Sequence, residues 1–288
     1  MAGFAERRWT TRDGLSLYGR DYAGGDGEHR LPVLCLHGFT RNSRDFEDLA
    51  PAIAATGRRV IAMDMRGRGQ SDRDPRPANY HPKVYARDVI GFLAGLGVPR
   101  ALFLGTSMGG IITLAVGLLR PALVGGAILN DVGPAVDPAG IARIQSYAGK
   151  APPVHNWQDA ADYLRAINGA ALPQLTGSDW DRMARRAFRD GPAGPVLDYD
   201  PAIASAGGAR TKTSSLIAWF AFRRLARRVP VLLLRGERSD ILSAQIAARM
   251  QRRAPAMRVA EVPGVGHAPT LAEPAAWAAI QAFLDSAP

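Results

Sequence analysis

The feature that most constrains this chain is one short glycine-rich segment, Gly105-Thr106-Ser107-Met108-Gly109-Gly110. An apolar run of strand length, residues 101–104, precedes it, and residues 111–116 continue like a helix. Gly-x-Ser-x-Gly between a strand and a helix is the sequence of a nucleophile elbow. Only glycine fits beside such a turn, because a Cβ would collide with the neighbouring backbone. The segment therefore predicts a tight turn that exposes the Ser107 side chain; the alternative is a glycine-rich turn with a passive serine.

Size and composition favour one globular domain. A chain of 288 residues can form a large α/β domain, with or without an insertion. No apolar segment of signal-peptide length lies near the N-terminus. The longest apolar stretch is broken at Arg120-Pro121, so we expect no membrane span. The single cysteine, Cys35, cannot form an internal disulfide, which is consistent with a cytoplasmic protein.

The net charge of +10 raises the question of an anionic partner. The basic residues are mostly scattered arginines, and no Lys/Arg block is interleaved with aromatic residues as in a nucleic-acid groove. We therefore interpret the charge as a compositional bias and expect no nucleic-acid partner.

Segments typical of strands and helices alternate along the first half of the chain. We expect strands at residues 6–10, 15–22, 33–36, 60–63, 101–104 and 123–129, and helices at 44–56, 83–96 and after Ser107. This order predicts a mostly parallel sheet with helices on both faces. Four polar residues follow predicted strands: His37, Asp64, Ser107 and Asp131. They should converge at one edge of the sheet, because sites in such folds form beyond the carboxyl ends of the strands.

The strand rhythm stops over residues 132–228. This stretch contains several helical segments, for example 141–148, 159–168, 179–188 and 214–227, separated by polar or Pro/Gly-rich connections. Strands then return at 231–234 and 259–262, with helices at 244–253 and 271–284. We predict a core made of residues 1–131 and 229–288, with residues 132–228 forming a helical lid over the strand ends.

The ordered motifs resemble those of the α/β-hydrolase superfamily over nearly the whole chain. The matching segments are His37-Gly38, residues 64–71, residues 105–110, Arg235-Gly236 with Asp240, and Gly266-His267. The resemblance implies a mostly parallel, twisted sheet of about eight strands, helices on both faces and an inserted helical lid. It also implies the serine-nucleophile branch of the family, which includes lid-containing esterases and carbon–carbon hydrolases.

Ser107 needs a base, because an alcohol is a poor nucleophile at neutral pH. His267 is the expected base, since it lies in a glycine-rich loop after the last strand and fits the family order of serine, acid and histidine. The acid must hold the imidazole in one tautomer and stabilise its charged form. We prefer Asp240, which occupies the usual family position. Asp131 remains the rival, because some relatives carry the acid after the strand that follows the elbow helix.

The resemblance places an oxyanion hole at the backbone amides of Phe39 and Met108. Donors of this kind contribute on the order of 3 kcal/mol each to the transition state. Asp64 is expected to bind amides of its own glycine-rich turn. We expect no metal and no cofactor, because the sequence has no metal-ligand cluster and Gly67-Arg68-Gly69 lacks the context of a nucleotide fingerprint.

The substrate pocket is less constrained by the sequence. Our candidates are His37, which could instead prop its own loop, Tyr147, Trp157, Trp219 and Phe220. Aromatic residues in a lid more often pack lid onto core than line a pocket. The lid arginines could bind a carboxylate or form a solvated helix face; they are residues 182, 185, 186, 189, 223, 224, 227 and 228.

The favoured function is a serine hydrolase that cleaves a carboxylic ester or lactone of a small to medium substrate through an acyl-enzyme. The alternatives are hydrolysis of a carbon–carbon bond in a ring-cleavage diketone and, from a different class, a non-catalytic ligand-binding protein. Relatives that open epoxides carry Asp at the elbow, whereas this chain has Ser107.

Overall fold

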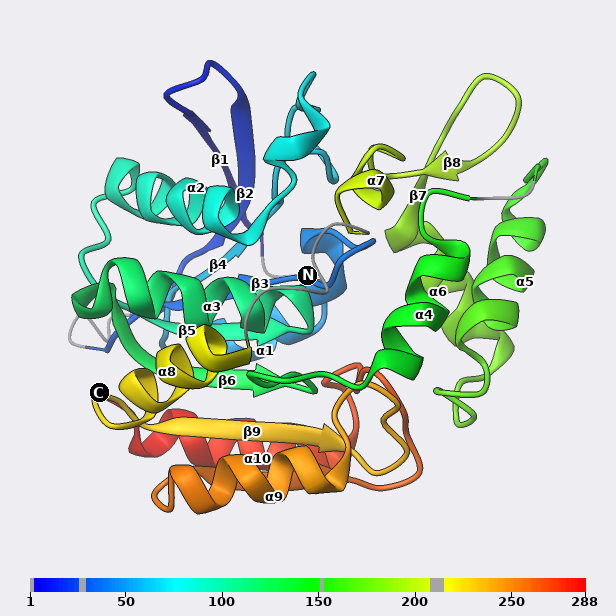
Figure 1. The fold of residues 1–288 in the computed structure, drawn as a ribbon. Helices are drawn as coiled ribbons and strands as arrows, with labels where there is room; N and C mark the ends of the chain where they lie inside the picture. The colour runs from blue at the N-terminus through cyan, green and yellow to red at the C-terminus, as the bar shows by residue number, and fades with distance from the viewer. Residues whose placement is uncertain (1–2, 26–29, 151–152, 208–214) are drawn as a thin grey trace.

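The computed structural model describes residues 3–25, 30–150, 153–207 and 215–288 and contains one eight-stranded sheet (Figure 1). The strands, in sheet order, are β1 (Ala5–Thr10), β2 (Ser16–Tyr22), β4 (Val60–Met63), β3 (Val33–Leu36), β5 (Ala101–Thr106), β6 (Val124–Asn130), β9 (Val231–Gly236) and β10 (Arg258–Val262). The strands from β4 to β10 pair in parallel, whereas the β1–β2 hairpin joins the sheet antiparallel to β4. The predicted mostly parallel sheet of about eight strands is confirmed.

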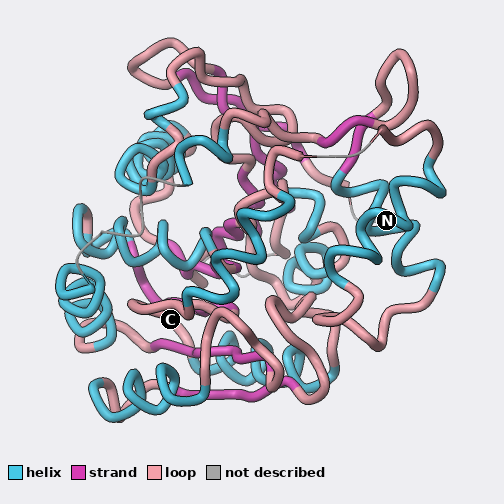
Figure 2. Tube along the Cα trace, turned by 45° about the vertical axis from the view of Figure 1, so that its right-hand side comes forward, coloured by secondary structure: helices cyan, strands magenta, loops and turns pink. Residues whose placement is uncertain are grey.

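The central strands are buried on both sides, which explains their continuous apolar sequences. One helical layer consists of α2 (Pro82–Gly95), α3 (Met108–Leu119), α8 (Ser215–Ala226) and α9 (Ala244–Arg253), and it shares one hydrophobic cluster with the sheet. Helices α1 (Leu49–Ala54) and α10 (Pro274–Ser286) pack in the other cluster. Most of the strands therefore lie between helices, as Figure 2 shows.

The predicted helix at 44–56 is shorter in the structure. Residues Ser43–Phe46 form a 3-10 turn, η1, and the α-helix begins only at Leu49. Pro51 explains the late start, because proline lacks an N–H and is tolerated only in the first turn of a helix. Two further 3-10 turns are η2 (Pro77–Asn79) and η3 (Pro121–Leu123).

The segment between β6 and β9, here called the insert, is mostly helical. It contains α4 (Pro138–Tyr147), α5 (Trp157–Asn168), α6 (Gly177–Ala187), β7 (Phe188–Arg189), β8 (Val196–Leu197), α7 (Ile203–Gly207) and α8. Helices α4, α5 and α6 lie on the side toward which the arrowheads of β6 and β9 point (Figure 1). Helix α8 instead packs on α3. The domain boundaries at 131 and 229 stay a prediction, and Ser214, which we expected in the last helix, falls outside the described residues.

None of the helices in the described ranges is both long enough and apolar enough to cross a membrane.

Candidate active site

Ser107 sits in a strained turn between β5 and α3. Its φ angle of 51° lies in the left-handed region, which non-glycine residues rarely adopt. A Cβ on Gly105 would lie 2.4 Å from the carbonyl carbon of Gly109, and a Cβ on Gly109 would lie 2.1 Å from the Leu36 oxygen. The flanking glycines are therefore required by close backbone packing, as the elbow motif predicts.

The structure brings the side chains of Ser107, His267 and Asp131 into one hydrogen-bonded chain. His267 Nε2 lies 2.9 Å from Ser107 Oγ, and His267 Nδ1 lies 2.7 Å from Asp131 Oδ2. The His267 side chain is 8% exposed and the Asp131 side chain is fully buried. The Asp131 carboxylate also accepts hydrogen bonds from the Gly236 amide, at 2.9 Å, and from Ser239 Oγ, at 2.6 Å. These donors compensate for its burial and fix its orientation.

The preference for Asp240 as the partner of His267 is wrong in this geometry. Asp240 instead forms a two-pronged ion pair with Arg143 of α4, at 2.6 and 3.0 Å. Burial alone would raise the pKa of Asp240, but the hydrogen bond and charge of Arg143 lower it overall. Asp131 follows β6, which pairs directly with β5, the strand that leads to Ser107. Asp240 follows β9, which is one strand further from β5. The turn after β9 contributes Ser239, a residue that sequence reasoning did not select.

The loop after β3 approaches Ser107 closely. A Cβ on Gly38 would lie 4.0 Å from Ser107 Cβ, and Phe39 lines the cavity beside the serine. Met108 begins α3, directly after the serine. Phe39 and Met108 thus both lie near Ser107, and the oxyanion hole at their amides stays a prediction.

His37 supports this loop from behind and does not border the cavity, so its assignment to the substrate pocket is wrong. The imidazole is fully buried and accepts a hydrogen bond from the Met65 amide through Nε2, at 3.1 Å. Nδ1 therefore carries the proton and donates it to the Gly38 oxygen, at 2.7 Å. Burial lowers the pKa of His37 to about 4, which keeps the ring neutral. In a planar trans peptide the N–H points opposite to the C=O, so this bond orients the Phe39 amide.

Asp64 holds the glycine-rich turn after β4. Its carboxylate accepts from the amides of Gln70, at 2.9 Å, and Ser43, at 2.6 Å. A Cβ on Gly69 would lie 2.1 Å from Asp64 Oδ2, so the turn closes tightly around the carboxylate. Burial raises the pKa of Asp64 to about 6, although the two amide bonds oppose that shift.

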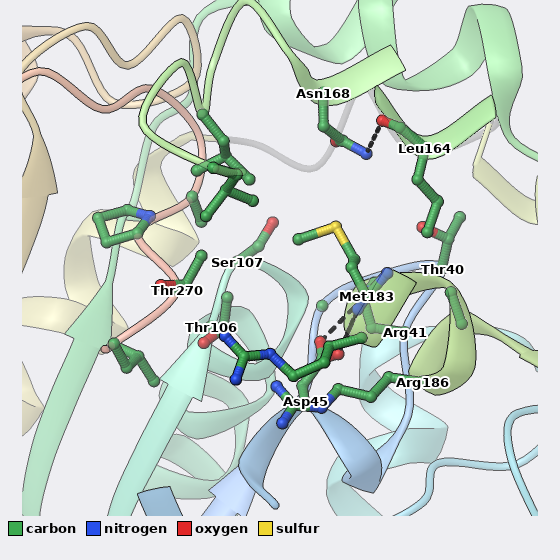
Figure 3. Close-up of a pocket in the computed structure, with 18 of the residues that line it drawn as sticks. Thr40, Arg41, Asp45, Thr106, Ser107, Leu164, Asn168, Met183, Arg186 and Thr270 are labelled. Atoms are coloured by element: carbon green, nitrogen blue, oxygen red, sulfur yellow. Dashed lines mark hydrogen bonds and ion pairs between the residues drawn. The ribbon is translucent and has the colours of Figure 1, made fainter. Parts of the chain in front are cut away.

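The Ser107 hydroxyl faces a cavity of about 360 Å³ between the strand ends and the insert (Figure 3). Its walls come from the loop after β3, from η1 and α1, from α4 to α6, and from the loop that carries His267. Apolar residues predominate, among them Leu164, Leu172 and Met183, with hydroxyl and amide groups from Thr270 and Asn168. A pocket with these walls suits a small organic substrate with a few polar groups.

Of the remaining predicted pocket residues, only Tyr147 lines this cavity. Trp157 stacks on Arg185, with 3.9 Å between the guanidinium carbon and the ring centre. Trp219 packs in α8 beneath two arginines of α9, and Phe220 is 58% exposed on the same helix. For Trp219 and Phe220 the cause is that the helical period does not reveal that α8 packs on α3 rather than over the strand ends. Trp157 lies on α5, which does line the cavity, but its ring is taken up by Arg185.

The charged side chains of the cavity wall are paired. Arg41 binds Asp45, Arg182 binds Asp179 on the same helix, and Arg186 binds Asp48. Figure 3 shows the Arg41–Asp45 pair beside the serine. Of the eight arginines singled out in the sequence, Arg182 and Arg186 reach the cavity, and both have acidic partners. The charges of the wall therefore largely cancel.

Within the described ranges, no group of three or more His, Cys, Asp or Glu side chains is placed to hold a metal ion.

A parallel sheet with a strained serine elbow, a histidine and a buried aspartate at its carboxyl edge defines the class of α/β-fold hydrolases. Comparison with known proteins supports the same class. The family model for the alpha/beta hydrolase fold matches residues 32–274. The chain belongs to this family.

Individual relatives and solved structures are also similar to this chain. The chain is 33% identical over 273 residues to a 3-hydroxybutyrate-oligomer hydrolase of Cupriavidus necator, covering 91% of each protein. It is 27% identical over 240 residues to a 2-(acetamidomethylene)succinate hydrolase of Mesorhizobium japonicum, covering 82% of this chain and 81% of the relative. The crystal structure of an alpha/beta hydrolase from Novosphingobium aromaticivorans superposes with a TM-score of 0.91, at 43% identity and 99% coverage of both chains. A general hydrolase activity follows from these similarities.

Proposed function

We propose that the chain is a serine hydrolase that cleaves carboxylic esters through an acyl-enzyme. The observation that carries the proposal is the hydrogen-bonded chain from Ser107 Oγ through His267 to Asp131. Nucleophile, base and orienting acid each have a contact of normal hydrogen-bond length, and this arrangement activates a serine.

In the proposed reaction, Ser107 Oγ attacks the ester carbonyl while His267 Nε2 takes the hydroxyl proton. Asp131 keeps Nδ1 protonated and stabilises the imidazolium that forms. The amides of Phe39 and Met108 donate to the oxyanion of the tetrahedral intermediate. His267 then returns its proton to the departing alcohol, and water, activated by the same imidazole, releases the acid.

The substrate class that we favour is a short ester of a hydroxy acid. The Cupriavidus necator relative supports this choice, because its name specifies oligomers of 3-hydroxybutyrate and it aligns over nearly its whole length. The cavity is consistent with it: its volume suits a short oligomer, and its mainly apolar wall with a few hydroxyl and amide groups suits repeated ester groups. The carbon–carbon hydrolase alternative has less support, since it relies on a lid arginine free to bind a carboxylate and both cavity arginines of the insert are paired.

The test is turnover of a substrate panel by the wild type and by Ser107→Ala. The panel contains 3-hydroxybutyrate dimer and trimer, p-nitrophenyl butyrate, a lactone and a vinylogous diketo acid. We expect hydrolysis of the esters, with the oligomers preferred, and loss of turnover in Ser107→Ala without loss of the folded circular-dichroism spectrum. Undiminished ester hydrolysis by that variant would refute the mechanism, and a preference for the diketo acid would refute the substrate class.

A further inference from the structure

Arg68 is a fully buried cation for which the described residues supply no ion pair. It lies in the glycine-rich turn after β4 and is 1% exposed. Its guanidinium instead lies over three aromatic rings, those of Phe39, Tyr80 and Tyr85, with 5.1 to 5.5 Å between the guanidinium carbon and the ring centres. Ring faces attract a cation, but less strongly than a carboxylate would at this depth.

The polar contacts of Arg68 lead to both residues whose amides are proposed to form the oxyanion hole, Phe39 and Met108. Nε donates to the carbonyl oxygen of Phe39, at 3.1 Å, and Nη2 lies 3.7 Å from the sulfur of Met108. Nη1 is held by the Tyr85 hydroxyl, at 2.7 Å, and the Arg66 carbonyl, at 2.9 Å. The guanidinium is thus fixed in one orientation, and it contacts both the Phe39 loop and the first residue of α3, Met108.

Burying a cation without a carboxylate partner is costly, even after relaxation of the surroundings. An apolar side chain of similar length would fill the same space at lower cost, so the place of the charge, next to Phe39 and Met108, is what calls for an explanation. A positive charge behind two amide donors would, however, favour the negative charge that develops on a carbonyl oxygen in front of them.

We propose that Arg68 is a positioning residue for the oxyanion hole, which holds the Phe39 and Met108 amides in place and strengthens their field with its own charge. The proposal rests on the serine-hydrolase function proposed above. His37 orients the Gly38–Phe39 peptide through the Gly38 carbonyl, and Arg68 fixes the next carbonyl along the loop. The two bonds together prevent the loop from rotating its amide away from the serine.

The chain contains a matched control, Arg58. It is also 1% exposed, it likewise forms no ion pair with an aspartate or glutamate side chain within the described residues, and it donates to main-chain oxygens. Those oxygens belong to Leu31, Leu284, Ala287 and Pro288, at the edge of the sheet opposite the one that carries Ser107. Replacing either arginine by methionine removes one buried guanidinium, but only Arg68→Met removes a group from the back of the oxyanion hole.

The experiment compares wild type, Arg68→Met, Arg68→Lys and Arg58→Met in ester hydrolysis, in inhibition by an alkyl boronic acid and in thermal unfolding. A boronic acid forms a tetrahedral anion on the serine and therefore reports on oxyanion binding, whereas KM reports on the neutral substrate. We expect Arg68→Met to lower kcat by about tenfold or more and to weaken boronate binding by a similar factor, with KM within about twofold. Arg68→Lys should recover part of both losses, and Arg58→Met should lower Tm without changing either quantity.

Two outcomes would overturn the inference: wild-type kcat and boronate affinity in Arg68→Met, or equal kinetic losses in Arg58→Met. Failure of the underlying function is distinguishable, because then the wild type itself would neither hydrolyse esters nor bind the boronate. If Arg68→Met fails to fold, the Arg68→Lys variant decides. Lysine keeps the positive charge but loses the guanidinium donor to the Phe39 carbonyl, so a boronate affinity equal to that of the wild type would contradict the positioning role.

Discussion

At the scale of single residues, the site depends on which carboxylate reaches His267. Asp131 adopts a φ angle of 55°, another left-handed non-glycine residue, and its carboxylate is held by Gly236, Ser239 and His267. Strained backbone at such a position is common where a functional group must be aimed. Asp240 directly follows Ser239 in the chain, but its carboxylate forms an ion pair with Arg143.

This assignment predicts unequal effects of removing the two acids. Asp131→Asn should reduce kcat for ester hydrolysis by a factor on the order of 10⁴, because the amide would favour the wrong imidazole tautomer. Asp240→Asn should keep kcat within a few-fold, since it breaks only the link to α4. Steady-state kinetics on one activated ester measure both; a larger loss in the Asp240 variant would reverse the assignment.

A second residue-scale prediction concerns His37 and acid stability. The ordinary pKa of histidine is 6.5, and burial lowers that of His37 to about 4. Below pH 6.5 the unfolded chain binds a proton that the folded chain does not, so the stability contributed by neutral His37 is present above that pH and lost as pH falls toward 4. The slope is at most about 1.4 kcal/mol per pH unit. Asp64 acts in the opposite direction, because its raised pKa of about 6 makes the folded state bind the extra proton.

The contribution of His37 is therefore measured as the difference in the free energy of unfolding between the wild type and His37→Asn. His37→Asn keeps a donor for the Gly38 carbonyl but does not titrate. Urea unfolding from pH 7 to pH 4 should show the stability advantage of the wild type over this variant shrinking as pH falls. An advantage that stays constant with pH would contradict the assignment of a neutral, buried imidazole.

At the scale of elements, the insert is tied to the core by the η1 turn. Arg44 donates to the carbonyls of Arg185 and Phe188, both at 3.0 Å, and forms an ion pair with Asp198. Asn42 donates to the Arg186 carbonyl, at 2.8 Å. One short turn thus binds the end of α6, β7 and the residue after β8, and both α6 and β8 contribute residues to the cavity wall.

Removal of this tie should loosen the wall without unfolding the sheet. In Arg44→Ala, we expect amide hydrogen exchange over residues 185–198 to accelerate by about tenfold or more, because local opening requires little free energy once the packing contacts are few. KM should rise more than kcat falls, since the wall binds substrate but does not carry the reacting groups. Arg8→Ala, which loses contacts to Gln70 and the Tyr18 ring and none to the insert, is the control. Equal exchange in both variants would show that Arg44 does not hold the insert.

At the scale of the whole molecule, the sequence predicted the sheet because buried parallel strands leave continuous apolar runs such as residues 33–36 and 231–234. It predicted the neighbourhood of Ser107 and His267 because glycine-rich turns mark the strand ends. It did not separate Asp131 from Asp240, since both follow strands and only the pairing order of β5, β6 and β9 decides which one is near. Of the candidate aromatic residues it placed only Tyr147 correctly in the pocket wall, because helical periodicity does not say which surface a helix of the insert packs against.

The central claim, a nucleophilic Ser107, is tested most directly by reaction with a fluorophosphonate followed by peptide mapping in the mass spectrometer. We expect one adduct, on Ser107, that is absent in Ser107→Ala and forms much more slowly in Asp131→Asn. Ester hydrolysis by a protein that forms no adduct, or an adduct on a different residue that abolishes activity, would contradict it.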